Sequence, residues 1–207
     1  MMLTEFPYIV VPDMSGDLIT DVEALLLSNN KQKTFDHVKA VAEMNIKIAE
    51  QYGLDKGICE LCAYLHDISA VVAPGDMMAY ATKRGWHIDE SERKHPFLLH
   101  QRVSKVVAEQ DFGIADEQIL SAVECHSTLK MNPSAYDMAL FVADKLAWDQ
   151  DEIHGEAPFY FVVSDALNQS LEAASLAYMD YIVDNKMILH PHKWFEEGVR
   201  FLRRTIA

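Results

Sequence analysis

Apolar residues recur along most of the chain at the spacing of an α-helix. Near the N-terminus, for example, Leu18, Val22 and Leu25 are separated by three or four positions. Because an α-helix has about 3.6 residues per turn, this spacing puts the three side chains on one face. Only the run YIVV at residues 8–11 suggests a short extended segment. The pattern therefore predicts an all-α fold.

Residues that commonly begin or end helices divide this pattern into segments. Ser, Thr, Asp and Asn often precede a helix, whereas Gly and Pro often end one. We expect helices to begin near Ser15 or Asp17, Thr34, Asp55, Pro96, Asp116 and Asn132, with boundaries at Gly53, Pro74 and Gly85. The helix after Asp55 is expected to run through LCAYLHDISA, residues 61–70. Two more helices are expected at about 164–185 and from 193 onward.

These helices are expected to pack as one domain. A chain of 207 residues, of which 50% are hydrophobic, can bury a sizeable core without disulfides. We expect a single helical bundle over residues 16–207, preceded by an N-terminal arm at residues 1–15 whose role the sequence does not indicate. The polar stretch 149–158 is the best candidate for a linker, but neither flank has the pattern of a separate domain.

The chain is strongly acidic. It has 18 Lys and Arg residues against 32 Asp and Glu residues, a formal net charge of −14. Such a charge repels nucleic acid and anionic membrane surfaces, so we expect neither as a partner. The N-terminus lacks the basic start and apolar run of a secretory signal, and no apolar stretch approaches the roughly 18 residues of a membrane span. We therefore expect a cytoplasmic protein, in which an anionic substrate would need a local cation.

Two of the three cysteines, Cys59 and Cys62, have the C-x-x-C spacing found in zinc and thiol-redox sites. They lie one helical turn apart in an apolar stretch, and the third, Cys125, makes no second pair. Buried cysteines that act as small hydrophobic residues are the simpler interpretation. A thiol oxidoreductase and a structural helical adaptor stay as weaker alternatives.

Several histidines and aspartates interrupt the apolar faces of the expected helices. They are His37, the adjacent His66 and Asp67, His100, His126 and Asp144. One buried histidine is usually a hydrogen-bonded core residue, but several buried ionisable groups are costly unless they share a partner. Imidazole and carboxylate are common ligands of divalent cations. A bound metal ion is therefore the simplest shared partner.

The order of these residues resembles the HD superfamily of metal-dependent phosphohydrolases. More narrowly, it is similar to the YqeK-type branch, the bacterial symmetrical diadenosine tetraphosphate hydrolases. The resemblance spans residues 34–198, and the stretches that carry it are HVKAVAEMNIKIAEQYGLD, AYLHDIS, FLLHQRVSKVVAE, AVECHST, ALFVADKL and NKMILHPHKWFEEG. The HD dipeptide alone is a weak signal, whereas the ordered set is a specific one.

The resemblance implies a site with two divalent transition-metal ions, iron or manganese. One ion would be held by His37, His66, Asp67 and Asp144, and the other by Asp67, His100 and His126, so that Asp67 bridges the two. The implied reaction is the hydrolysis of a nucleotide phosphoanhydride, diadenosine tetraphosphate to ADP. Asp67 and Lys145 are the expected catalytic residues, and Lys145 would neutralise charge on the phosphoryl group. The alternative for Lys145 is a surface lysine paired with Asp149.

The chain departs from the branch at positions that bear on the substrate. Thr34 stands where the branch usually has an arginine, and QRVSK and AWDQDEIHGEAPF replace two further motifs. An HD-type nucleotidase or phosphatase acting on another nucleotide or small phosphate ester therefore stays open. So does a non-catalytic nucleotide-binding HD module, and a homodimer is one option for the oligomeric state.

The remaining charged residues carry weaker expectations. Lys33, Arg102 and Lys130 are secondary candidates for phosphate contacts, although solvated charge is the simpler interpretation. The acidic residues Glu90, Glu92, Glu196 and Glu197 are expected to form a solvated face.

Overall fold

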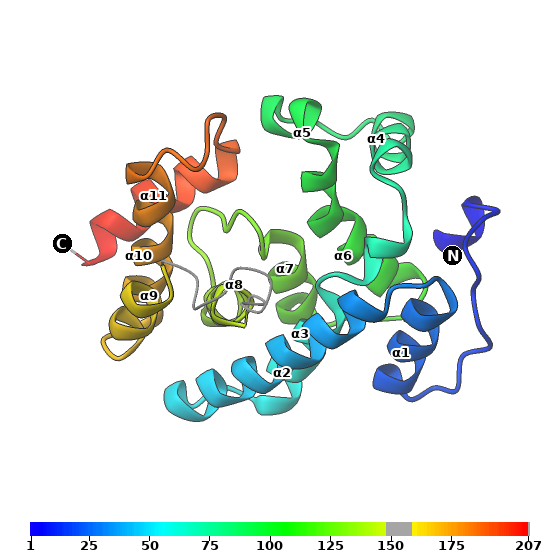
Figure 1. Ribbon diagram of the computed structural model, residues 1–207, viewed down its shortest axis with the longest axis horizontal. Helices are drawn as coiled ribbons and strands as arrows, with labels where there is room; N and C mark the ends of the chain where they lie inside the picture. The colour runs from blue at the N-terminus through cyan, green and yellow to red at the C-terminus, as the bar shows by residue number, and fades with distance from the viewer. Residues whose placement is uncertain (148–158, 207) are drawn as a thin grey trace.

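The computed structural model describes residues 1–147 and 159–206, and over these residues the fold is all-α, as predicted (Figure 1). No described residue lies in a β-strand, so the run at 8–11 is not a strand. The α-helices are α1 (Leu18–Ser28), α2 (Gln32–Tyr52), α3 (Lys56–Leu65), α4 (Pro74–Lys83), α5 (Glu90–Lys94), α6 (His100–Gln110), α7 (Glu117–Cys125), α8 (Ala135–Leu146), α9 (Tyr160–Leu167), α10 (Leu171–Asp184) and α11 (Lys193–Ile206). Three short 3₁₀ helices are η1 (Leu3–Glu5), η2 (Ile68–Val71) and η3 (Pro96–Leu99). No described helix is both long and apolar enough to cross a membrane.

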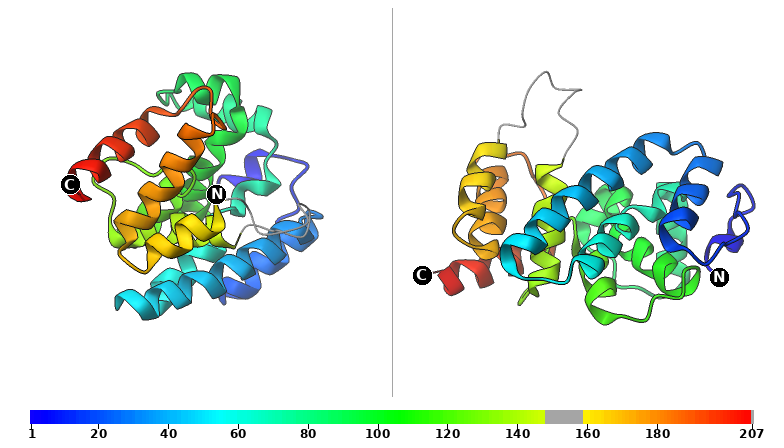
Figure 2. Two further views of the ribbon diagram at one scale, coloured as in Figure 1. Left: turned by 60° about the vertical axis from the view of Figure 1, so that its left-hand side comes forward. Right: turned by 90° about the horizontal axis from the view of Figure 1, so that it is seen from below.

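The helices surround α3 and α8. The long helix α2 packs along α3 and α8, and α7 packs against α3, α6 and α8. Helices α9, α10 and α11 gather at one end of the molecule, and the N-terminal arm lies at the other end (Figures 1 and 2). Every residue from 137 to 146 in α8 is buried, because most of them are apolar and the neighbouring helices α2, α3, α7, α9 and α10 cover the helix. Polar residues in α8 therefore face protein interior or a site.

Local signals located several helix ends correctly. The side chains of Asp17, Asp55 and Asp116 accept hydrogen bonds from the first turns of α1, α3 and α7, as predicted for N-caps. Gly53 ends α2 with a φ of 67°, a left-handed conformation that glycine adopts without strain. The prediction for Thr34 was wrong, since α2 begins at Gln32 and Thr34 lies in its first turn.

The predicted helix through LCAYLHDISA is interrupted. Helix α3 ends at Leu65, and the chain turns at His66 and Asp67 before η2. Contacts with α6 hold this turn: the Ser69 hydroxyl donates to the His100 carbonyl oxygen at 2.9 Å, and the Ser69 N–H donates to the Ser104 hydroxyl at 3.2 Å. The adjacent histidine and aspartate thus stand at a helix end, where their side chains are free to diverge.

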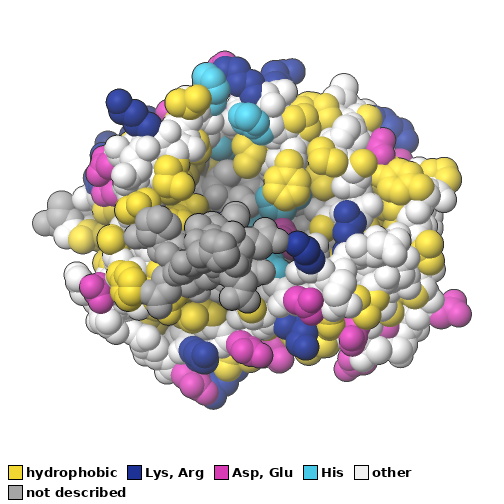
Figure 3. Space-filling model, viewed as in Figure 1, with side chains coloured by type: hydrophobic (Ala, Val, Ile, Leu, Met, Phe, Trp, Pro, Cys, Tyr) yellow, Lys and Arg dark blue, Asp and Glu magenta, His cyan; other side chains and the backbone are white. Residues whose placement is uncertain are grey.

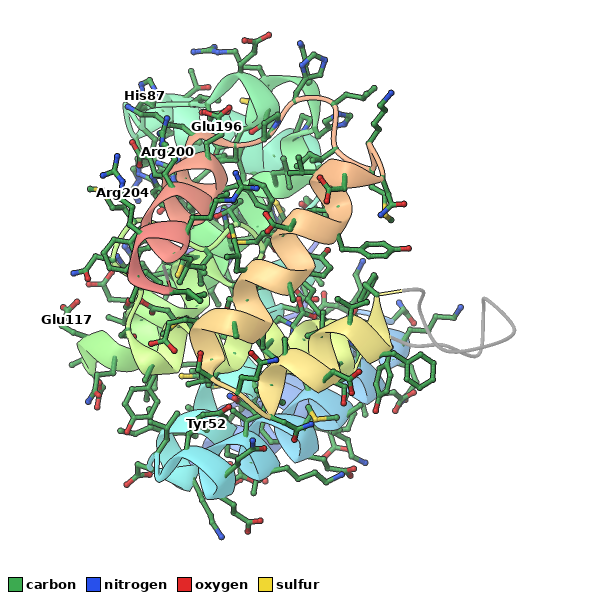
Figure 4. The ribbon with its side chains drawn as sticks, turned by 90° about the vertical axis from the view of Figure 1, so that its left-hand side faces the viewer. Tyr52, His87, Glu117, Glu196, Arg200 and Arg204 are labelled. Atoms are coloured by element: carbon green, nitrogen blue, oxygen red, sulfur yellow. The ribbon has the colours of Figure 1, made fainter. Side chains whose placement is uncertain are left out.

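The predicted helix at 164–185 is two helices, α9 and α10. The Ser170 hydroxyl accepts the Ala173 N–H and caps α10. At the break, the Leu167 carbonyl oxygen accepts hydrogen bonds from the Tyr52 hydroxyl and the Gln51 amide, which come from α2. Figure 4 labels Tyr52. The contact with α2 thus occupies a carbonyl at the end of α9. The predicted linker at 149–158 lies outside the described residues.

The N-terminal arm is tied to the domain along its length. Met2 and Leu3 are fully buried, and the backbone N–H groups of both donate to the Asp111 carboxylate. Farther along, the Glu5 carboxylate pairs with Lys83 of α4 and with Arg84, the residue that follows this helix. The arm therefore contributes to the core and to the surface beside α4.

The cysteines are buried and free. Burial raises the pKa of the Cys59 thiol to about 12 and that of Cys62 well above its ordinary value. Since the thiolate is the reactive form, these pKa values argue against thiol chemistry and favour the packing interpretation.

One predicted solvated residue is buried. Glu92 is 0% exposed and pairs with Arg102 and His192. The Arg102 guanidinium also lies over the Trp86 ring, 4.4 Å from its centroid. The prediction of a solvated Glu92 was therefore wrong, because tertiary contacts supply the cations that it needs. Glu90 and Glu196 are exposed, as expected, and Figure 4 shows Glu196 on the outward side of α11.

Candidate metal centre

The six predicted ligand residues meet at one place in the structure. They come from five parts of the chain: His37 from α2, His66 and Asp67 from the turn after α3, His100 from the start of α6, His126 from the end of α7, and Asp144 from α8. In the space-filling view, histidine and acidic surface is visible at the middle of the molecule among apolar side chains (Figure 3). Helix ends and the buried helix α8 thus bring distant residues together.

The Asp67 carboxylate stands between two pairs of histidines. Its Oδ2 atom lies 3.6 Å from His66 Nε2 and 4.0 Å from His37 Nε2. Its Oδ1 atom lies 3.4 Å from His100 Nε2 and 3.5 Å from His126 Nε2. In each of the two groups, the three candidate ligand atoms lie within 4.8 Å of one another, close enough for a shared metal ion. One carboxylate therefore belongs to both groups through different oxygen atoms.

Asp144 completes the first group. Its Oδ1 atom lies 3.1 Å from His37 Nε2 and 3.8 Å from His66 Nε2. Burial pulls the pKa of His37 down, but the hydrogen bond and charge of Asp144 outweigh this and leave the pKa raised. The first group thus offers two imidazoles and two carboxylates, and the second offers two imidazoles and one carboxylate.

Backbone hydrogen bonds orient three of the imidazole rings. The Nδ1 atoms of His66, His100 and His126 contact the carbonyl oxygens of Ala63, Phe97 and Val123 at 2.6, 2.7 and 2.8 Å. A carbonyl oxygen only accepts, so each Nδ1 carries the proton and donates it. In the neutral ring Nε2 is then an acceptor with a lone pair directed into the site.

The converging lone pairs require a positive partner. His100 Nε2 lies 2.9 Å from His126 Nε2, and His66 Nε2 lies 3.3 Å from His37 Nε2. Burial lowers the pKa of His66 and of His100 to about 4, so both rings are neutral at neutral pH. Of the neighbouring groups, the Ser127 hydroxyl lies 3.1 Å from His100 Nε2 and can donate to it. A set made almost entirely of nitrogen and oxygen acceptors fits divalent transition metals.

Lys145 is buried rather than at the surface. It is 4% exposed, and its ammonium donates to Asp144 Oδ2. Burial raises the pKa of Asp144, but the Lys145 charge outweighs this and holds it well below its ordinary value. The ammonium also lies 5.2 Å from the ring centroid of Phe141 and 5.6 Å from that of Tyr178. The surface-lysine alternative is therefore wrong, and its partner Asp149 lies outside the described residues.

Two secondary candidates for phosphate contacts are engaged elsewhere. Arg102 Nη1 donates to the Glu92 carboxylate and to the His87 carbonyl oxygen. The Lys130 ammonium donates to the Ser121 hydroxyl at 2.6 Å and lies 3.6 Å from Asp137. These pairings favour structural roles for both residues.

Sequence reasoning missed three neighbours of the site. Ser127 follows a predicted ligand and was detectable as a polar residue next to His126. Phe97 lies parallel to the His100 ring, with centroids 4.4 Å apart and planes at 13°. Tyr178 approaches Lys145 from α10, and no spacing in the sequence signals a contact across that distance.

Comparisons with known proteins identify the family of the chain. The HD domain family matches residues 34–149, which is more than half of the chain. A protein of Lactococcus lactis subsp. cremoris, described as an uncharacterized protein in the pepC 5' region, is 31% identical over 201 residues, or 96% of this chain and 98% of that protein.

Two further relatives have an assigned activity. A symmetrical bis(5'-nucleosyl)-tetraphosphatase of Staphylococcus aureus is 31% identical over 114 residues, 55% of this chain and 58% of that protein. One of Bacillus subtilis is 28% identical over 118 residues, 55% of this chain and 63% of that protein. The matches thus span less than two thirds of these tetraphosphatases.

A solved structure shares the fold. It is a crystal structure from Clostridium acetobutylicum described as a predicted HD superfamily hydrolase involved in NAD metabolism. It superposes with a TM-score of 0.78 over 93% of this chain and 98% of that one, at 23% sequence identity.

Proposed function

The chain belongs to the HD domain family and is an HD-domain hydrolase, and from this premise we propose that it hydrolyses a nucleotide phosphoanhydride, diadenosine tetraphosphate to ADP, with two divalent metal ions. One observation carries the proposal. The two oxygen atoms of Asp67 face separate pairs of histidines, each through its Nε2 atom. Such an acceptor set fits two cations bridged by one carboxylate.

The ligands divide as the geometry groups them. His37, His66, Asp67 and Asp144 would hold the first ion, and Asp67, His100 and His126 would hold the second. Iron and manganese suit imidazole and carboxylate ligands. Bound there, two ions would activate water near neutral pH and neutralise phosphate charge, which an acidic chain cannot do alone.

The chain's own residues position this chemistry. The backbone carbonyl oxygens of Ala63, Phe97 and Val123 fix the imidazole rings, so the ligands are already oriented. The Lys145 ammonium holds one oxygen of Asp144 and leaves the other directed to His37. Because Lys145 is buried beside the first ligand group, we also assign it the stabilisation of charge on the phosphoryl group.

The substrate assignment has two supports. The relatives with an assigned activity are symmetrical bis(5'-nucleosyl)-tetraphosphatases. A pocket of about 670 Å³, lined in part by Asp67 and His100, adjoins the ligand groups and lies within the roughly 300–1,000 Å³ of small-molecule sites. An organic nucleotide therefore has room beside the metal ligands.

Two measurements on purified protein test the proposal. Elemental analysis should find two equivalents of transition metal per chain, and the loaded protein should convert diadenosine tetraphosphate to ADP faster than it cleaves mononucleotides or simple phosphate esters. Asp67→Asn should abolish both properties, whereas His95→Ala, at an exposed histidine outside the ligand groups, should change neither. Faster cleavage of a mononucleotide would show that diadenosine tetraphosphate is not the preferred substrate. A protein that takes up no metal would overturn the proposed mechanism.

A further inference from the structure

The pocket beside the second ligand group has walls from separate parts of the chain. Asp67 and His100 line its inner side. The rest of the lining comes from Tyr8 and Val10 of the N-terminal arm, the corner between α1 and α2, the segment from η2 to α4, and Phe97. The pocket has a volume of about 670 Å³ and adjoins the candidate metal centre. A molecule bound in this pocket would therefore lie against Asp67 and His100.

Phe97 presents an aromatic surface in the pocket. The side chain is 54% exposed, although phenylalanine is usually buried in a folded protein. Its ring is parallel to the His100 imidazole, with centroids 4.4 Å apart, so one face is covered by a candidate ligand. The exposed remainder offers a flat apolar surface directly beside the centre. Nucleobases stack on such surfaces, because every base has an aromatic face.

The wall formed by the arm is held firmly. The Tyr8 hydroxyl donates to Asp76 at 2.7 Å and accepts the Ala73 N–H at 3.0 Å. The Asn29 amide accepts the Val10 N–H at 2.9 Å and donates to the Val10 carbonyl oxygen at 2.7 Å. This wall lies before residues 34–149, which match the HD domain family. The arm therefore adds a feature to the site that the matched region does not contain.

The polar groups of the pocket suit a nucleoside phosphate. Ser28, Asn30 and Thr34 line the pocket and carry hydrogen-bonding groups, and Lys31 is the basic residue among the described lining residues. The aromatic surface suits a base, and the hydrogen-bonding groups suit a ribose. The cation next to the metal centre suits the phosphates.

We propose that this pocket binds one nucleoside end of the substrate, with its base stacked on Phe97 and its phosphates directed to Asp67 and His100. The inference rests on the proposed function, because it takes the substrate to be a nucleotide. Phe97 is then a specificity-determining residue that favours nucleotides over phosphates without a base. Tyr8 and Val10 of the arm hold the nucleoside in place.

Binding of two matched ligands to the manganese-loaded protein tests the role of Phe97. ADP and inorganic pyrophosphate both carry a diphosphate, but only ADP carries a base. In Phe97→Ala, the Kd of ADP should rise about 5- to 140-fold, because base stacking is worth about 1–3 kcal/mol and 1.4 kcal/mol is a factor of ten. The Kd of pyrophosphate should stay unchanged, and Phe97→Tyr should retain the parent affinity for ADP.

Controls separate stacking from other effects. Metal content should be the same in all variants, and loss of metal in Phe97→Ala would show that the ring acts by supporting His100, which overturns the stacking role. Phe161→Ala changes a phenylalanine of α9 that is 62% exposed and does not line the pocket, and it should bind both ligands normally. An unchanged Kd of ADP in Phe97→Ala, an equal loss for both ligands, or no ADP binding by the parent protein would overturn the inference.

The two proposals can fail separately. If ADP binding depends on Phe97 but diadenosine tetraphosphate is not cleaved, the proposed reaction is wrong and the nucleoside pocket stands. If the tetraphosphate is cleaved to ADP but Phe97→Ala leaves ADP binding unchanged, the reaction stands and the pocket assignment is wrong.

Discussion

The Nε2 atoms of His100 and His126 face each other at 2.9 Å, while the Nδ1 atom of each ring donates to a backbone carbonyl oxygen. In the neutral form of the two rings Nε2 carries no proton, so this contact would place two lone pairs together. Two buried imidazoles in this arrangement store repulsion that a cation between them and Asp67 would relieve. The stability and the metal content of the protein should therefore be coupled.

Removal of metal should destabilise the folded protein. A ligand that binds only the folded state and is present at about 100 times its Kd adds about 2.7 kcal/mol of stability. Addition of a chelator should accordingly lower the Tm, measured by differential scanning calorimetry, and manganese or iron should restore it. The chelator should leave the Tm of Asp67→Asn unchanged. An equal decrease in the two proteins would show that the chelator acts elsewhere.

Asp67→Asn should release both ions, since Asp67 belongs to both ligand groups. His126→Ala should release only the second ion, because that imidazole faces Asp67 Oδ1. Both variants should lose activity by more than the roughly 10–100-fold that is typical of changing a partner of a ligand. Metal equivalents per chain, measured by elemental analysis, distinguish the two variants. Full metal occupancy in Asp67→Asn would contradict the bridging assignment.

Lys145→Met should destabilise the metal-free protein by about 3–5 kcal/mol, because it leaves the Asp144 carboxylate buried without its charged partner. The double variant Lys145→Met/Asp144→Asn should recover part of this loss, since it removes the unpaired charge. Urea unfolding in the presence of a chelator measures both effects. If Lys145→Met is as stable as the parent, the ion pair does not hold Asp144.

Asn29→Ala should loosen the N-terminal arm, because it removes two hydrogen bonds to Val10 that are worth about 0.5–1.5 kcal/mol each. Amide exchange at residues 8–11 should accelerate, and the KM of the nucleotide substrate should rise. Asn185→Ala is a matched control, because both asparagines cap the end of a helix and donate to the carbonyl four residues earlier. An equal increase of the KM in Asn185→Ala would contradict a role of the N-terminal arm in substrate binding.

Stability should fall in acid partly through Glu92. Burial raises the pKa of this carboxyl, but His192, the Asp89 N–H and Arg102 outweigh it and leave the pKa below the ordinary 4.5. The Glu92 carboxylate therefore binds a proton more readily in the unfolded chain than in the folded protein. The stability that Glu92 contributes is fully present above pH 4.5 and is lost as the pH falls through the lower pKa of the folded state. As the pH is lowered, the urea concentration at the midpoint of unfolding should decrease more steeply for the parent protein than for Glu92→Gln. Parallel declines would exclude Glu92 as a contributor.

Local sequence patterns were enough to identify the helical character of the chain and the residues that meet at the site. Helical spacing and the caps Asp17, Asp55 and Asp116 depend on neighbours a few positions away, so they can be identified locally. The histidines and aspartates stood out because they are polar residues on apolar faces. The resemblance to the HD superfamily then supplied their grouping, which local patterns alone cannot give.

The positions of the helix breaks and the partners of the buried charges depend instead on long-range packing. Helix α3 ends at Leu65 because Ser69 bonds to α6, and α9 ends where Tyr52 and Gln51 of α2 bond to its last carbonyl. Likewise, Lys145 pairs with its neighbour Asp144 in a buried site, and the arm reaches the pocket beside Phe97. These contacts join residues that are far apart in sequence or depend on burial, and burial is a property of the packed chain rather than of any local stretch.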